Sequence, residues 1–405
     1  MECELTETLP GELPEALRAE LVAFRRDLHM HPELGNQEFR TTAAIKARLE
    51  EAGLAPRVLG GGTGLVCDVG SGAHSGARPM LALRADIDAL PIPDTKLGVP
   101  YRSTVPDRAH ACGHDVHTTV VLGTGLVLAA MAREGTLPFA VRLIFQPAEE
   151  VLPGGAAQAI KEGVLDGVGK IIALHCDPRV DAGRIGLRHG PITSACDRLE
   201  VSLDGAGGHT ARPHLTTDLV TAVAKVATEV PAVVARRTDA RSGLSLTWGR
   251  IESGHAANVI PQHAELSGTV RCLDLKTWRE APDLVHDAVQ EIAGLYRATS
   301  DVTYVRGVPP VVNDGGVADL LRDAMVERRG IASVEDTEQS LGGEDFSWYL
   351  EHVPGAMARL GVRRPGERTV RDLHQGDFDV DESAIAVGVE LFTAAALLDH
   401  ARAED

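Results

Sequence analysis

The sequence predicts an α/β protein with a mostly parallel central sheet, helices on both faces of that sheet, and a smaller α+β unit inserted in mid-chain. Strand and helix patterns alternate from residue 80 to residue 175, and this order gives parallel strands joined by right-handed crossovers. Residues 197–307 instead show the order β-α-β-β-α-β, which is typical of a split-βαβ, or ferredoxin-like, unit. Residues 314–403 return to the first pattern, so we expect the smaller unit to be an insertion.

The composition limits the class of protein. A chain of 405 residues with 44% apolar content can bury a full core and suggests two domains. Its net charge of −18 argues against nucleic acid or an anionic membrane as a partner. The start MECELTETLP does not resemble a signal peptide, and the longest apolar stretch, 118–132, is too short to span a bilayer. Six cysteines without regular spacing are typical of reduced thiols, so we expect a cytoplasmic protein.

The N-terminal part is expected to form two helices and the first strands of the sheet. Apolar residues at helical spacing mark 12–29 and 41–54, and Gly53 ends the second helix. Apolar runs at 64–69 and 80–90 predict strands separated by the turn GSGAHSGARP. The run at 80–90 is apolar enough to be a central strand.

The later elements follow from the same rules. In the first pattern we expect a buried helix at 116–133, strands at 141–146 and 170–175, and a helix at 155–165. In the inserted unit we expect strands at 197–205, 243–251, 264–273 and 301–307, and helices at 217–236 and 276–296. After it we expect helices at 314–329 and 381–403 and an apolar stretch at 356–362.

The segment HACGHDVHTT, directly before the long buried helix, concentrates potential metal ligands. It holds Cys112, His114, Asp115 and His117 within six positions. Thiolate, imidazole and carboxylate are the ligand types that bind zinc and similar metals, which favours a metal site. Taken alone, the segment fits equally well a pair of core or helix-cap histidines beside an inert buried thiol.

A second cluster, FQPAEE, favours the metal site. Glu149 and Glu150 directly follow the apolar run VRLIF, so one carboxylate can bind a metal while the other acts as a base. An isolated pair of glutamates is more often a solvated surface pair, but here a buried strand precedes it and a Gln-Pro turn follows that strand. His175 and His374 each follow a further apolar stretch.

These side chains come from several strand ends. Asp86 and Asp88 lie at or just past the end of the predicted central strand, where ligands gather in open α/β sheets. The five candidate ligands are more than one four-coordinate zinc keeps while leaving a position for water; they are Cys112, His114, Glu150, His175 and His374. Five ligands, some of them shared, suit two metals about 3.5 to 4 Å apart bridged by a water. Glu149 is then the natural base.

The inserted unit offers fewer signals. His209 stands in the glycine-rich segment GAGGHTARPH, where it either faces a partner surface or is simply a loop histidine. Arg271, at the end of a predicted strand, either clamps a carboxylate or forms a surface ion pair. The glycines of GGGTG at 60–64 fit neither a P-loop nor a dinucleotide fingerprint, so we expect a turn there.

Eight motifs, in this order, resemble the dinuclear-metal aminoacylase and carboxypeptidase family: LHMHPELGNQEF, RADIDALPI, HACGHDVHTT, FQPAEE, GGHTARPH, NVIP, GGEDFS and LHQGDFD. They are similar to its cysteine-containing amidohydrolase branch of hippurate hydrolases, auxin-conjugate hydrolases and N-acetyl-diaminopimelate deacetylases. The resemblance spans nearly the whole chain. It implies a zinc-peptidase-like catalytic domain of residues 1–192 and 308–405, with residues 193–307 as a lid and dimerisation domain.

The resemblance also implies residue roles. The expected metal ligands are Cys112, His114, Glu150, His175 and His374. Glu149 would be the catalytic acid/base, and Asp86 and Asp88 match an RADxDALP motif whose acidic residues support the metal site. His209 resembles the family histidine that reaches, in dimers, towards the partner's active site. Two further residues match positions that line that pocket, namely Asn258 and Arg271.

We therefore expect a cytoplasmic, metal-dependent amidohydrolase that cleaves N-acyl (acetyl, benzoyl or similar) L-amino acids. It would hold two divalent metals per chain, with zinc fitting the ligands best and manganese, cobalt or nickel as alternatives. It would act as a homodimer through the inserted unit, or as a higher oligomer. The alternatives are a metallo-carboxypeptidase or dipeptidase, a non-catalytic metal-containing binding or scaffold protein, and a single structural zinc at Cys112 and His114. Glu149 speaks against the scaffold, since a structural site has no use for a base.

Overall fold

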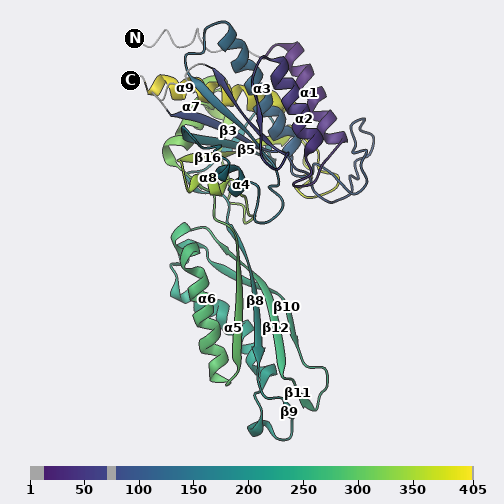
Figure 1. The fold of residues 1–405 in the computed structure, drawn as a ribbon, viewed down its shortest axis with the longest axis vertical. Coiled ribbons are helices and arrows are strands. Elements are labelled where there is room, and N and C mark those ends of the chain that lie inside the picture. The colour runs from purple at the N-terminus through teal and green to yellow at the C-terminus, as the bar shows by residue number, and fades with distance from the viewer. Residues whose placement is uncertain (1–12, 71–78, 404–405) are drawn as a thin grey trace. The chain divides into compact units, whose positions relative to one another are not determined.

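The computed structural model describes residues 13–70 and 79–403. The start of the chain with Cys3, and most of the expected turn GSGAHSGARP, therefore lie outside the described residues. The chain divides into two compact units (Figure 1). The first comprises Met1–Gly190, Asn313–Glu338 and Trp348–Asp405, and the second comprises Pro191–Val312 and Gln339–Ser347. The roles expected for them, catalytic domain and lid, stay predictions.

An eight-stranded sheet forms the centre of the first unit, in the order β1-β2-β4-β3-β5-β16-β6-β15. The strands are β1 Arg57–Val58, β2 Leu65–Gly70, β3 Met80–Asp86, β4 Ala140–Gln146, β5 Val168–Asp181, β6 Ile185–Leu187, β15 Val334–Asp336 and β16 Gly355–Arg363. Neighbours among β4, β3, β5 and β16 run parallel, whereas β2 is antiparallel to β4 and β6 is antiparallel to β16. The predicted mostly parallel sheet is confirmed.

Helices pack on this sheet (Figure 1). They are α1 Glu15–Met30, α2 Phe39–Glu51, α3 His114–Arg133, α4 Ala156–Lys161, α7 Gly315–Arg329 and α9 Ser383–Arg402, with the short η3 Ile331–Ser333 and α8 Ser347–Leu350. α3 packs on β2 and β3, and α7 and α9 pack on β16. By length and composition α3 and α9 could each span a membrane, but 83% and 67% of their most apolar windows are buried inside the protein. That burial is expected of core helices.

The start of α3 depends on Gly113. This residue has φ +86°, and a Cβ atom there would lie 2.7 Å from Sγ of Cys176, so only glycine fits the position. The helix begins at His114, two residues earlier than the apolar pattern predicts. As a result His114 and His117 occupy the first turn and Cys112 stands just before it.

The second unit has the predicted β-α-β-β-α-β order. Its four-stranded antiparallel sheet is ordered β10-β12-β8-β13. The main elements are β8 Ala195–Asp204, α5 Leu219–Arg237, β10 Ser245–Ser253, β12 His263–Cys272, α6 Leu275–Leu295 and β13 Thr299–Val308. Shorter elements are β9 Gly208–His209, η1 Pro213–Leu215, η2 Ala240–Ser242 and β11 Val259–Ile260, with β7 Gly190–Pro191 and β14 Val312–Asn313 where the chain passes between units. Residues of α5, α6 and the sheet form one apolar core.

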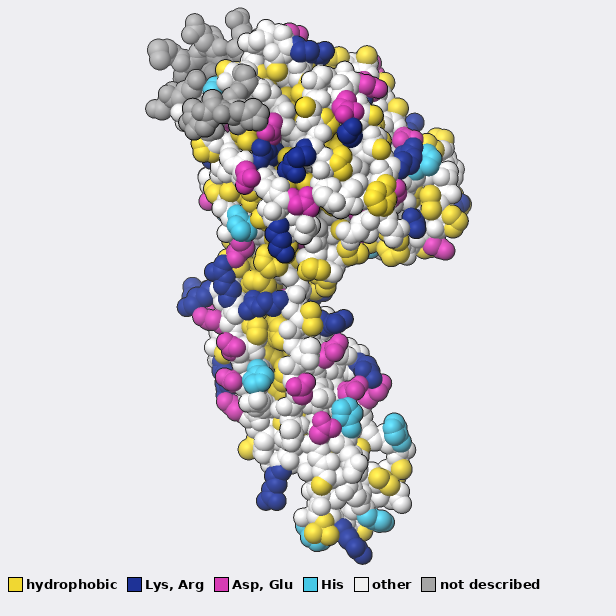
Figure 2. All heavy atoms as spheres, viewed as in Figure 1, with side chains coloured by type: hydrophobic (Ala, Val, Ile, Leu, Met, Phe, Trp, Pro, Cys, Tyr) yellow, Lys and Arg dark blue, Asp and Glu magenta, His cyan; other side chains and the backbone are white. Residues whose placement is uncertain are grey.

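Charge and thiols are distributed without an obvious concentration. On the face visible in Figure 2, positive and negative side chains are interspersed over each unit, so the acidic surplus is not gathered there. The described cysteines are free thiols, as expected, and they are Cys67, Cys112, Cys176, Cys196 and Cys272. Four of them are buried, so Cys112 is distinguished by its neighbours and not by exposure.

Candidate metal centre

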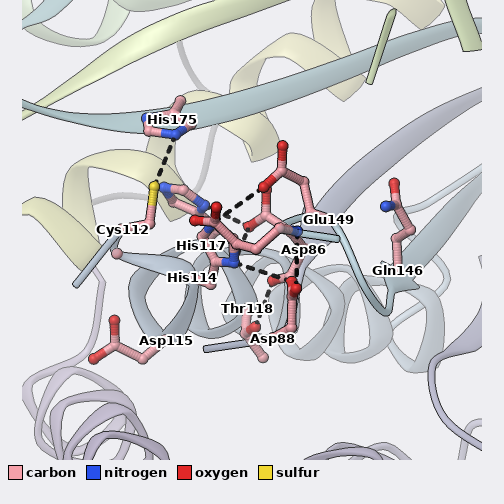
Figure 3. A network of polar contacts seen from close by, with 12 residues as sticks. Asp86, Asp88, Cys112, His114, Asp115, His117, Thr118, Gln146, Glu149 and His175 are labelled. Atoms are coloured by element: carbon pink, nitrogen blue, oxygen red, sulfur yellow. Dashed lines mark hydrogen bonds and ion pairs between the residues drawn. The ribbon is translucent and has the colours of Figure 1, made fainter. Parts of the chain in front are cut away.

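Acidic and imidazole side chains from three adjacent strands meet at one edge of the large sheet. Asp86 ends β3, Glu149 and Glu150 follow the end of β4, and His175 lies on β5. The strands β4, β3 and β5 are neighbours and run parallel, so the ends of β4 and β3 share an edge. The strand predicted to end at His175 continues to Asp181, and His175 lies within β5, level with the end of β3. The loop before α3 brings Cys112 to the same place (Figure 3).

The five predicted ligands form two groups that share the thiol. Cys112, His114 and His175 can offer ligand atoms that all lie within 4.8 Å of one another, and so can Cys112, Glu150 and His374. Sγ of Cys112 is 3.5 Å from Nε2 of His175 (Figure 3). Nε2 of His374 is 3.2 Å from Oε1 of Glu150. The structure therefore brings all five together from distant parts of the sequence.

His374 reaches this place on the loop between β16 and α9. Its backbone amide donates a hydrogen bond to the carbonyl of Ala111 at 2.8 Å. The loop that carries His374 is thus fastened to the loop that carries Cys112. Because Ala111 directly precedes Cys112, this bond sets the spacing between the thiol and the imidazole.

The hydrogen bonds of two histidines fix which nitrogen can bind a metal. Nδ1 of His114 lies 3.2 Å from Oδ1 of Asp88, and Nδ1 of His175 lies 2.9 Å from the carbonyl of Cys176. Both oxygens accept only, so Nδ1 donates to them and Nε2 is the nitrogen left to bind a cation. Nε2 of His114 is buried without a hydrogen-bond partner among the described residues. Such an atom fits a cation ligand.

The electrostatics of the cluster also favour a cation. Burial by itself lowers the pKa of His114, but the carboxylates of Asp86, Asp88 and Glu150 outweigh burial and raise that pKa to about 10. Burial raises the pKa of the Cys112 thiol well above its ordinary value, and nearby carboxylates raise it further. A divalent cation would displace the proton of such an imidazole and stabilise the thiolate. The donor set therefore fits the expected metals.

His117 is not available as a ligand. Its Nδ1 lies 2.6 Å from Oδ1 of Asp86, and its Nε2 accepts a hydrogen bond from the amide of Cys176 at 2.8 Å. Both ring nitrogens are used. The alternative reading of the motif, a satisfied core histidine, therefore holds for His117 but not for His114.

The two aspartates of RADIDALPI have different partners. Asp88 accepts a hydrogen bond from the backbone amide of Glu150 at 2.9 Å, and its other oxygen faces His114 (Figure 3). Asp86 accepts from Nη1 of Arg84 at 2.6 Å and from His117. Its distance to Nδ1 of His114 is longer, at 3.8 Å. Asp88 therefore touches two predicted ligand residues directly.

Glu149 and Glu150 are not a solvated surface pair. Their side chains are only 10% and 13% exposed. Glu149 Oε2 is 3.9 Å from Nε2 of His114, and Glu150 Oε1 is 3.8 Å from the same nitrogen. Two consecutive carboxylates thus reach one imidazole, which leaves one placed to bind a cation and the other to handle a proton beside it.

A buried network behind the site escaped the sequence analysis. Oδ2 of Asp115 forms an ion pair with Nε of Arg25 at 2.7 Å and accepts a hydrogen bond from Nδ1 of His29 at 2.7 Å. Burial alone would raise the pKa of Asp115, but Arg25 and His29 hold it well below its usual range. The network fastens α1 to the first turn of α3, next to His114. The available signal was His29, the first histidine of the LHMHPELGNQEF motif.

The residues predicted for substrate binding lie in the second unit. His209 and Asn258 are exposed neighbours, since Val259 pairs with His209 and the amide of Thr210 donates to the Asn258 carbonyl at 3.2 Å. Figure 2 shows histidine side chains gathered over this end of the unit. Arg271 is at the other end of β12, where it pairs with Cys196 and donates to the carbonyl of Leu341. The structure does not bring Arg271 together with His209 and Asn258 within one chain.

Comparisons with known proteins agree on a family. The family model "Peptidase family M20/M25/M40" matches residues 82–398. A Rhodococcus jostii protein assigned by its name to the glutamate–cysteine ligases is 48% identical over 98% of this chain, which spans 48% of that protein's length. An N-acetyl-L-cysteine deacetylase of Bacillus subtilis is 38% identical, with 91% of this chain and 85% of that protein covered.

Solved structures agree as well. A Bacillus subtilis protein described as a dinuclear metal binding peptidase of the M20 family is 31% identical to this chain. It superposes with a TM-score of 0.81, covering 96% of this chain and 99% of its own. The family resemblance carried by the eight motifs is confirmed. The chain therefore belongs to peptidase family M20/M25/M40, and it is an enzyme that hydrolyses amide bonds.

Proposed function

We propose that this chain hydrolyses the amide bond of N-acyl L-amino acids to a carboxylic acid and a free amino acid. The observation that carries the proposal is the pair of ligand groups sharing Cys112, with the Glu149 carboxylate 3.9 Å from the imidazole of His114. A site that only stabilised the fold would not need a second carboxylate there. The similarity to a deacetylase of an N-acyl amino acid supports the proposal.

The ligands of the proposed centre are those that the sequence predicts. Cys112, shared by both groups, would serve two divalent cations. His114 and His175 would complete one ligand group, and Glu150 and His374 the other. When bound, the cations polarise the scissile carbonyl and lower the pKa of the attacking water. Zinc suits thiolate and imidazole best, and manganese, cobalt and nickel are the alternatives.

Glu149 would move the proton. Its carboxylate takes a proton from the attacking water and later delivers it to the leaving nitrogen, which departs as an amine. Asp88 would support the centre, because it orients the imidazole of His114 and the backbone of Glu150 at once. Asp86 would support the centre less directly, because it holds His117 in place and His117 is not a proposed ligand.

The substrate class can be narrowed. The Bacillus subtilis relative is named for the deacetylation of N-acetylcysteine. The Rhodococcus jostii relative, of which this chain spans 48%, is named for a ligase of glutamate and cysteine. N-acylcysteines are therefore the first substrates to test. A carboxypeptidase or dipeptidase activity is the second candidate, because the dinuclear relative of known structure is described as a peptidase.

A substrate panel tests the proposal. Metal-loaded protein is assayed on N-acetyl and N-benzoyl amino acids, N-acetylcysteine included, and on dipeptides of the same residues. We expect faster turnover of the N-acyl amino acids, and faster dipeptide turnover would reverse the ranking. Equal turnover by wild type and Glu149→Gln would overturn the role proposed for Glu149, whereas no turnover by wild type on any substrate of the panel would overturn the catalytic proposal and support a binding or scaffold protein. A metal content near one ion per chain would support the single structural zinc instead.

Assembly and location are part of the proposal. We expect a homodimer formed through the inserted unit, or a higher oligomer, with His209 acting at the partner's active site and Asn258 and Arg271 completing the substrate pocket. The exposed position of His209 in the second unit and the outer position of β10 in its sheet support this. Light scattering measures the mass of the particle. The cytoplasm stays the predicted location.

A further inference from the structure

The turn before the two glutamates adopts an unusual backbone conformation. Ala148 is buried and has φ +58°, a region that side chains with a Cβ atom disfavour. Its carbonyl accepts a hydrogen bond from the amide of Gly155 at 2.9 Å, and its own amide donates to Oε1 of Glu38 at 2.7 Å. In an extended chain, consecutive side chains point to opposite sides. The turn at Ala148 lets Glu149 and Glu150 reach the same nitrogen.

Glu38 is an unexpected residue to find there. It directly precedes α2 and is fully buried, and its Oε2 has no hydrogen-bond partner among the described residues. Burial, together with the negative charge of Asp88, raises the pKa of Glu38 to about 7, although backbone amides, that of Ala148 among them, oppose the rise. Keeping an acid in such a place is costly.

Helix capping does not explain Glu38. The Glu38 side chain makes no capping hydrogen bond to α2. Glu33 does so instead, because its carboxylate accepts from the amides of Arg40 at 3.0 Å and Thr41 at 2.8 Å. The loop between α1 and α2 thus holds two glutamates, one directed to the helix and the other to the turn at Ala148.

The whole loop lies against the segments that carry the site carboxylates. A Cβ atom on Gly35 would lie 3.0 Å from Cγ2 of Val151 and 3.2 Å from Cα of Ala148. On its other side, the carbonyl of Glu33 accepts from the amide of Ala89, the residue after Asp88, at 2.8 Å. The loop is therefore in contact with the chain on both sides of the candidate metal centre.

We propose that Glu38 is a positioning residue for the reaction. By holding the amide of Ala148, it fixes the turn that directs Glu149 and Glu150 to one imidazole. The inference rests on the roles proposed above for these two glutamates. Without the Glu38 carboxylate, the buried amide of Ala148 would lose its hydrogen-bond acceptor. Because Ala148 also has a strained left-handed backbone, the turn would rearrange. Misplacement of a catalytic group by about 1 Å can cost on the order of a hundredfold in rate.

Three variants test the inference at saturating metal. Glu38→Met keeps the volume but removes the acceptor, and we expect kcat to fall about ten- to a hundredfold with KM changed less than about threefold. Glu38→Gln keeps an oxygen for the Ala148 amide and should recover most of kcat. Glu33→Ala is the matched control from the same loop, and it should lower Tm but keep kcat. Should Glu38→Met not fold, Glu38→Ala replaces it.

The outcomes separate this inference from the proposed function. Wild-type kcat in Glu38→Met, or a loss of kcat that Glu38→Gln does not recover, would overturn the positioning role. So would an equal loss of kcat in Glu33→Ala, since that would mark a general effect of the loop. Glu149→Gln is assayed in parallel. If Glu149→Gln is inactive while Glu38→Met is fully active, only the positioning role fails, whereas the absence of wild-type turnover on every N-acyl amino acid overturns the proposed function itself.

Discussion

Replacing Asp88 by asparagine should weaken metal binding about ten- to a hundredfold, the usual cost of losing a support behind a metal ligand. The carboxylate of Asp88 accepts from two donors, Nδ1 of His114 at 3.2 Å and the amide of Glu150 at 2.9 Å. An asparagine offers one oxygen and one NH₂ group, so one of these donors must face another donor. Asp88 is 1% exposed, and a buried unsatisfied donor costs about 1 to 3 kcal/mol. At about 1.4 kcal/mol per tenfold, this agrees with the range above.

The assay for Asp88→Asn is a competition titration against a chelator of known affinity, for one metal at a time. His114→Ala is the reference for a large loss of metal affinity, because it removes a predicted ligand. Affinity of Asp88→Asn within twofold of wild type, with clear loss in His114→Ala, would refute the reasoning. It would mean that the two hydrogen bonds do not orient the ligands.

Three further predictions follow from the same geometry. Glu149→Gln should lower kcat by about 10²- to 10⁴-fold with unchanged metal content, measured by elemental analysis alongside the kinetics. Mixing inactive Glu149→Gln with inactive His209→Ala should restore about a quarter of wild-type activity if His209 acts across a two-fold dimer, and no recovery would place His209 elsewhere. Glu38 has a pKa of about 7 against an ordinary 4.5, so between these values the folded protein binds more protons than the unfolded chain and its stability falls as pH rises. Urea unfolding of metal-depleted protein measures this effect. Between a pH below 4.5 and a pH above 7, the free energy of unfolding of wild type should fall by about 3 kcal/mol relative to that of Glu38→Gln.

Much of the site follows from local pattern. Apolar strands and helical spacing predict that Asp86, Glu149 and His175 lie near neighbouring strand ends, because parallel strands present their carboxyl ends at one edge. The structure adds that β3 lies between β4 and β5. The start of α3 was missed by two residues, because the helix begins at His114, directly after a glycine that fits against Cys176, and not at the first apolar residue.

The supporting contacts could not be predicted from pattern. Glu38 bonds the amide of Ala148, and Asp115 pairs with Arg25. These pairs join segments far apart in the chain, and nothing in their local sequence distinguishes a buried partner from a solvated charge.

The number of buried carboxylates around the candidate metal centre requires an explanation. Asp86, Asp88 and Glu150 all act on His114, and in the absence of cations their charge is offset by imidazoles and by the guanidinium of Arg84. Burying several acids together is costly even where each has a partner, so stability of the fold alone does not explain why they are gathered at one sheet edge. Cations bound there would repay that cost. The acids are therefore better explained by metal binding than by stability, and removal of one should affect affinity before it affects the fold.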